Sequence, residues 1–211
     1  MRAALVVLAA CGSALHEPSP IAQFAPGHGE GRSADALIAL ARRAQAEHRA
    51  AAAQDLYLDA AAADDSRIDA VLGAMRVIAD RIEHEPGAAK AALTDEEVQL
   101  GQWCQRRAPA HAECDYRLAI ALGEYARDHA SAGRDAVTRM VGLLHRAIAE
   151  NPGLDDGGPH RVLALVLLRA PGWPVGPGDP DAGLAEARAA VAIAPHAAAN
   201  QDVLREALAA Q

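Results

Sequence analysis

The 211-residue sequence contains few aromatic residues, one lysine and three cysteines. Phe, Trp and Tyr make up 3% of the chain, whereas alanine is frequent, and this composition favours helices whose small side chains let the backbones approach closely. Lys90 is the lone lysine, the arginines are interleaved with acids, and the formal net charge is −8. Because binding to nucleic acid or to acidic headgroups requires clustered basic residues, the sequence argues against both partners.

The patterns typical of common catalytic sites are also missing. None of the nine histidines belongs to an H-E-x-x-H motif, and no serine lies in G-x-S-x-G. Two acidic stretches, 155–159 and 179–181, resemble fragments of calcium loops but lack the later bidentate glutamate, so we expect a capped helix to begin at each instead. We therefore predict no enzymatic activity, no cofactor and no metal site.

Arg2 is followed by an apolar run from Ala3 to Ala10, and together they have the shape of a secretory signal. The run is too short to span a bilayer, and it ends at Leu8-Ala9-Ala10-Cys11-Gly12. This ending resembles the bacterial lipobox, in which small residues precede a cysteine that accepts lipid. The resemblance implies a signal peptide at 1–10 and a periplasmic protein anchored to the outer membrane by lipid on Cys11. The alternative is an incidental cysteine in an ordinary apolar terminus.

Proline and glycine are frequent from 11 to 33, and no helical apolar period occurs there. We therefore expect the lipidated cysteine to be followed by a flexible tether. The rest of the chain, 34–211, is predicted to form one helical-repeat domain.

Apolar residues recur at helical spacing after Ser33, which is the expected cap of the first helix. A second helix follows, and six residues of this pair match the tetratricopeptide consensus, with small residues where helices cross and larger ones between: Leu37, Leu40, Ala41, Ala53, Tyr57 and Ala60. The pair therefore resembles one repeat of about 34 residues.

More helices are predicted downstream. One begins near Ile68 and stops at Pro86, and Thr94 is expected to open the next through a capping box with the acids that follow it. Segments of the form Leu/Ala-x-x-Ala-x4-Pro, typical of the end of a repeat, occur before Pro152 and before Pro195. We predict an all-α fold of antiparallel helix pairs stacked as a degenerate tetratricopeptide-like array, an α-solenoid, with the apolar helix at 162–168 as its most buried element.

Cys104 and Cys114 flank Pro109, where two predicted helices meet. In an exported protein we expect them to form a disulfide, which would stabilise the fold by roughly 3 kcal/mol in the chain-entropy model. Two reduced and buried thiols are one alternative. A metal site that adds His111 is another.

The most distinctive stretch runs from Gly158 to Asp179. It opens with a G-P-x-R helix start and continues into a loop whose prolines bracket Trp173. With the closing A-x4-P helix, it resembles the periplasmic T component associated with TRAP transporters, over about Tyr116 to Leu208. That resemblance implies helical repeats around a cavity and, as protein partner, the substrate-binding subunit of a transporter.

Four residues are candidates for contact with a ligand or partner: Trp173, Arg161, Arg169 and Tyr125. The alternative interpretation is that the tryptophan pins its loop to the helices beneath and that the arginines cap carbonyls and pair with acids. We predict a lipid-anchored scaffold for protein–protein interaction. A small-molecule-binding accessory of a TRAP-type transporter is the other hypothesis, and it requires a dry cavity lined by the helix at 162–168, whereas a solid core there would count against it.

Overall fold

The computed structural model describes residues 21–27, 29, 31–129 and 133–211, so the predicted signal peptide and Cys11 lie outside the described residues. Within these ranges the regular elements are helices, which confirms the predicted all-α class. They are α1 (Ala34–Ala46), α2 (Ala50–Ala63), α3 (Ile68–His84), α4 (Gly87–Arg107), α5 (Ala112–Asp128), α6 (Gly133–Glu150), α7 (Gly158–Arg169), α8 (Pro180–Ile193) and α9 (Ala198–Ala209), with short 3-10 helices η1 (Ile21–Gln23) and η2 (Leu154–Asp156).

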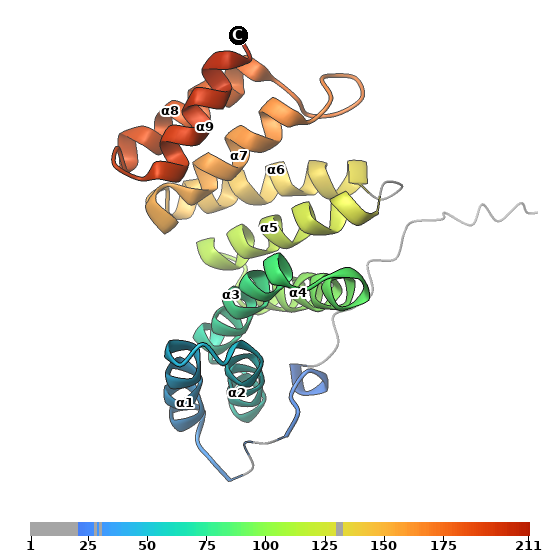
Figure 1. Ribbon diagram of the computed structural model, residues 1–211, viewed down its shortest axis with the longest axis vertical. Coiled ribbons are helices and arrows are strands. Elements are labelled where there is room, and N and C mark those ends of the chain that lie inside the picture. The colour runs from blue at the N-terminus through green and yellow to red at the C-terminus, as the bar shows by residue number, and fades with distance from the viewer. Residues whose placement is uncertain (1–20, 28, 30, 130–132) are drawn as a thin grey trace, which may run out of the picture.

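The helices stack in chain order, from α1 and α2 at one end to α8 and α9 at the other (Figure 1). Each helix packs against the next, and α3 also meets α5, while α7 meets α9. Contacts between successive and alternate helices are the pattern of a helical solenoid, in which each repeat touches only its neighbours. None of the helices in the described ranges is long and apolar enough to cross a membrane.

Two predicted helix starts are confirmed by their caps. The Ser33 hydroxyl accepts a hydrogen bond from the Ala36 amide at 3.3 Å and begins α1. The Asp179 carboxylate accepts one from the Ala182 amide at 3.0 Å, and Pro180 supplies the first residue of α8. Proline at that position removes only an amide that would have no partner within the helix.

The helix predicted to open at Thr94 begins earlier, at Gly87, so the capping box is wrong. Thr94 is buried inside α4, where its hydroxyl donates to the Lys90 carbonyl at 3.0 Å. This bond to the preceding turn lets a threonine lie within a helix. The alanines that precede it favour continuation of the helix from Gly87.

Residues 21–27, in the later part of the segment predicted as a flexible tether, belong to the folded structure instead. Ile21 is buried, and Phe24 packs against the same apolar core beside α2. The Gly27 amide donates to the Asp59 carboxylate of α2 at 2.8 Å. Two apolar residues three positions apart give this short segment one face that it can bury, a pattern too brief to stand out in the sequence.

Helix α7 is not the most buried element. Leu163, Ala164 and Leu167 are buried, but Val162 and Val166 are only half-buried. Ala164 packs against α8 and α9, whereas Leu163 and Leu167 pack in the core that α7 shares with α5 and α6. Val162 and Val166 lie on the face toward α5 and α6, and there they line a cavity.

Candidate functional site

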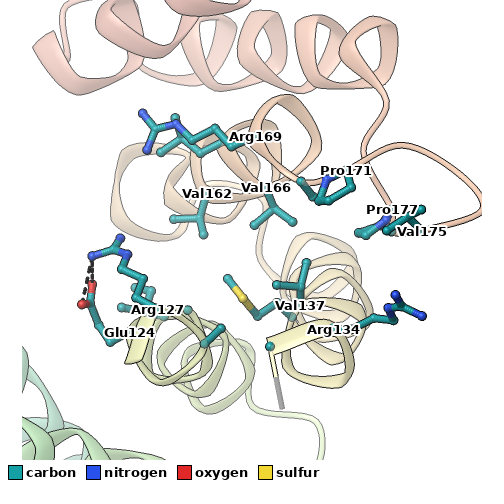
Figure 2. Close-up of a pocket in the computed structure, with 18 residues that line it drawn as sticks. Glu124, Arg127, Arg134, Val137, Val162, Val166, Arg169, Pro171, Val175 and Pro177 are labelled. Carbon is teal, nitrogen blue, oxygen red and sulfur yellow. Dashed lines mark hydrogen bonds and ion pairs between the residues drawn. The ribbon is translucent and has the colours of Figure 1, made fainter. Parts of the chain in front are cut away.

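A cavity of about 610 Å³ lies between α5, α6, α7 and the loop 170–179 that joins α7 to α8 (Figure 2). Each helix contributes about two turns to its wall, from Ile120 to Arg127, from Gly133 to Met140 and from Val162 to Arg169. The floor is formed by aliphatic side chains and a thioether, namely Ile120, Val137, Met140, Val162, Leu165 and Val166. A cavity of this size with a mostly apolar lining is typical of sites for small organic ligands.

Three arginines surround this apolar floor. Figure 2 shows Arg127 and Arg169 on one side of the cavity and Arg134 on the opposite side, near Val175 and Pro177. Arg127 donates to Glu124 at 2.8 Å, and Arg169 forms two hydrogen bonds of 2.7 Å with Glu206 of α9. Among the side chains that the structure describes, no carboxylate pairs with Arg134. Among the described side chains, the rim therefore carries one guanidinium, that of Arg134, without a carboxylate partner.

The loop 170–179 is held closed at its base by backbone hydrogen bonds. The Gly178 amide donates to the Pro171 carbonyl at 2.8 Å, and the Asp179 amide donates to the Leu167 carbonyl at 2.9 Å. A Cβ atom on Gly178 would lie 2.1 Å from the Ala170 carbonyl oxygen, so only glycine fits this approach of two backbone segments. The loop thus has a defined shape.

The closed loop displays Trp173 to solvent. This side chain is 90% exposed, and the neighbouring Val175 is 50% exposed. The interpretation that Trp173 pins the loop to the helices is therefore wrong. Pro171, Val175 and Pro177 form part of the cavity wall, whereas Trp173 projects from the loop and is not part of that wall.

The structure separates the four predicted binding residues. Arg169 lines the cavity, and Trp173 belongs to the loop that walls it. Arg161 lies at the other end of α7 and pairs with Asp155 at 3.0 Å, as the alternative interpretation expected. The Tyr125 ring stacks on His129 with centroids 4.0 Å apart.

Sequence reasoning missed Arg127 and Arg134. Both flank the α5–α6 connection, so in the sequence they are only two basic residues near the ends of predicted helices. Arg127 and Arg134 line one cavity with Arg169 because α7 packs over α5 and α6. The 3.6-residue period within a helix carries no information on that packing.

Asn200 of α9 is the centre of a second polar cluster, away from the cavity. It is completely buried, and its amide nitrogen donates to the carbonyls of Asp156 and Ala190, each at 2.9 Å. Its oxygen accepts a hydrogen bond of 2.9 Å from Arg161. Since these groups come from η2, α7 and α8, the cluster is a structural connection among the last repeats.

The sulfur atoms of Cys104 and Cys114 lie at bonding distance, the two Cα atoms are 5.4 Å apart, and both side chains are buried. This placement agrees with the predicted disulfide at the α4–α5 connection, and its formation in the cell stays a prediction. In the part of the chain that the structure describes, no three His, Cys, Asp or Glu side chains are grouped as metal ligands.

Glu97 of α4 carries a carboxyl group that is enclosed within the helical core. Its side chain is completely buried, and neither oxygen has a hydrogen-bond partner among the described residues. Burial raises the pKa of Glu97 to about 8, although the charge of Arg117 acts in the opposite direction. Because the group is enclosed and lies outside the cavity lining, it bears on stability rather than on a reaction.

Comparison with solved structures finds similarity to the crystal structure of a thermophilic TPR protein from Thermus thermophilus. The TM-score is 0.63 at 19% sequence identity, and the match covers 84% of this chain and 88% of that chain. No protein-family model and no curated protein matches the sequence. The similarity confirms the predicted fold of stacked antiparallel, tetratricopeptide-like helix pairs.

Proposed function

We propose that this protein is a non-catalytic helical-repeat scaffold that binds a protein partner, with the Trp173 loop as its main contact. The observation that carries the proposal is a 90% exposed tryptophan on a loop held closed at its base. Tryptophan is enriched among the residues that dominate binding energy at interfaces, and a loop ordered in advance loses little entropy on binding. Stacked repeats provide the extended surface beside it.

In this proposal the scaffold is exported and anchored by lipid on Cys11 at the periplasmic face of the outer membrane. The support is the lipobox-like sequence from Leu8 to Gly12 after the apolar run. The partner would be the substrate-binding subunit of a TRAP-type transporter. The support for this partner is the resemblance of the stretch from Gly158 to Asp179 to the T component of such transporters.

A photo-crosslinking amino acid at position 173 is expected to link the protein to its partner in the producing cell, and the same amino acid at Leu208 is not. Leu208 is the matched position because it is an exposed apolar residue on a different element, α9. With the purified partner, Trp173→Ala should weaken binding by about 2 kcal/mol, roughly thirtyfold, and leave thermal stability unchanged. The interface is wrong if neither position links to a protein, or if Trp173→Ala binds as tightly as Leu208→Ala.

The anchor is tested by the intact mass of the membrane-extracted protein, with and without reductant. We expect a chain that begins at Cys11 and carries the added mass of lipid. On reduction its mass should rise by two hydrogens, one for each sulfur of the broken disulfide. Cys11→Ser should remove the lipid and leave the reductant-dependent change intact. An unprocessed wild-type chain with free thiols would contradict both the lipid anchor and the Cys104–Cys114 disulfide.

The second candidate function is a small-molecule-binding accessory of such a transporter. This hypothesis required a dry cavity lined by the helix at 162–168, and its support is the apolar lining that Val162, Leu165 and Val166 contribute to the cavity. Because the 170–179 loop walls the cavity and also displays Trp173, the two candidate functions are compatible.

A further inference from the structure

We propose that the cavity between α5, α6 and α7 binds a small amphiphilic acid, that is, an apolar chain or ring that ends in a carboxylate. The proposal rests on the second candidate function and names its ligand class. The first support is the size and lining of the cavity, about 610 Å³ with an apolar floor. Such a floor removes an apolar body from water, which is the main favourable contribution to binding a ligand of this kind.

The second support is the charge at the rim. The chain as a whole carries a formal net charge of −8, yet Arg127, Arg134 and Arg169 all line this cavity. Glu124 is the acid in the described lining, and Arg127 at 2.8 Å and Lys90 at 3.7 Å balance its charge. An anionic head group therefore meets a positive rim on an otherwise acidic protein.

Arg134 is the residue to which we assign the head group. Arg127 and Arg169 already have carboxylate partners, whereas no such partner is found for Arg134 among the described side chains. Its side chain is exposed, and Figure 2 shows it on the same side of the cavity as Val175 and Pro177. A guanidinium presents parallel donors that match both oxygens of a carboxylate, so it recognises this group better than an alcohol.

The dimensions favour a small molecule over a peptide. Each of the three helices lines the cavity over eight residues, and α-helical rise makes that roughly 10 Å. An extended peptide of the usual recognition length would need a groove that continues over further repeats. A medium-length alkyl chain fits the length of this cavity.

The test is calorimetric titration of the full chain with decanoate and, in parallel, with decan-1-ol, which has the same chain and no charge. We expect one site that binds decanoate about tenfold more tightly than decanol at low salt, with a smaller difference at high salt. Arg134→Gln should weaken decanoate binding about fivefold and leave decanol binding unchanged. The matched control is Arg42→Gln, another exposed arginine, on the distant helix α1, and it should bind both ligands like the wild type.

Blocking variants address the cavity itself. Val166→Asp on α7 and Val137→Asp on α6 each place a carboxylate on the apolar floor, and each should abolish binding of both ligands in a protein whose helical circular dichroism is retained. Two positions on different helices are used so that misfolding of one variant does not decide the result.

The outcomes test the ligand class separately from the candidate function, small-molecule binding, on which it rests. Equal affinity for decanoate and decanol overturns recognition of an acid and leaves an apolar ligand site. An Arg134→Gln variant that behaves like Arg42→Gln overturns the assignment of the head group to Arg134. Absence of binding by either ligand overturns the small-molecule function as well. Crosslinking at position 173 is unaffected in each case, because Trp173 does not line the cavity.

Discussion

Glu97→Gln is expected to stabilise the protein by roughly 3 kcal/mol at pH 7 and to remove much of its loss of stability between about pH 5 and pH 8. The reason is the enclosure of Glu97 in α4, where neither carboxyl oxygen has a hydrogen-bond partner among the described residues. A neutral amide of nearly the same shape fills the same space, and it never ionises.

The direction follows from the two protonation equilibria of this carboxyl group. In the unfolded chain its pKa has the ordinary value near 4.5, and in the folded protein burial raises the pKa to about 8. The folded state therefore holds a proton that the unfolded state releases. The favourable contribution is present in full below pH 4.5, decreases as the pH rises, and is lost above about pH 8.

Chemical denaturation at a series of pH values measures this effect. We expect the curves of wild type and Glu97→Gln to meet near pH 4.5 and to separate as the pH rises. Glu83→Gln is the control, because Glu83 is an exposed glutamate of α3 and its replacement should leave the pH dependence unchanged. Parallel curves for wild type and Glu97→Gln would show that Glu97 has an ordinary pKa in the folded protein.

Asn200→Ala is expected to destabilise the protein by roughly 3 kcal/mol, because it leaves several buried polar groups without partners. The Asn200 amide joins the Asp156 carbonyl of η2 to the Ala190 carbonyl of α8 and also accepts from Arg161 of α7. Without it, the last repeats lose the cluster that connects them. The loss should appear first in amide exchange of α8 and α9.

The matched control is Asn151→Ala, at an exposed asparagine after the end of α6. Its replacement should change the free energy of unfolding by no more than about 0.5 kcal/mol. Urea denaturation of the two variants beside wild type gives the comparison. A loss for Asn200→Ala no larger than that for Asn151→Ala would mean that the Asn200 hydrogen bonds contribute little.

Much of the local structure was predictable from the sequence. Ser33 and Asp179 cap the helices that follow them through hydrogen bonds to residues three positions ahead, and such bonds depend on local sequence alone. Pro86 ends the apolar period of α3, and the proline-rich stretch after Arg169 interrupts the helices, both as predicted. The prediction failed at Ile21, whose burial depends on contacts with residues far along the chain, and at Thr94, which lies inside a helix that begins seven residues earlier at Gly87.

The sequence by itself determined the helix periods, the caps and breaks between helices, and the repetition that makes antiparallel pairs stack. These properties depend on residues within one or two turns of each other, where side-chain spacing and backbone hydrogen bonds decide the conformation. Only the tertiary structure decided that Arg127, Arg134 and Arg169 surround one apolar cavity, that Trp173 is displayed rather than buried, and that Glu97 is enclosed. The cavity and the display of Trp173 depend on how α7 and its loop pack over α5 and α6, and the enclosure of Glu97 depends on how α4 packs against α5. The spacing of residues within a single helix does not specify how that helix packs against another.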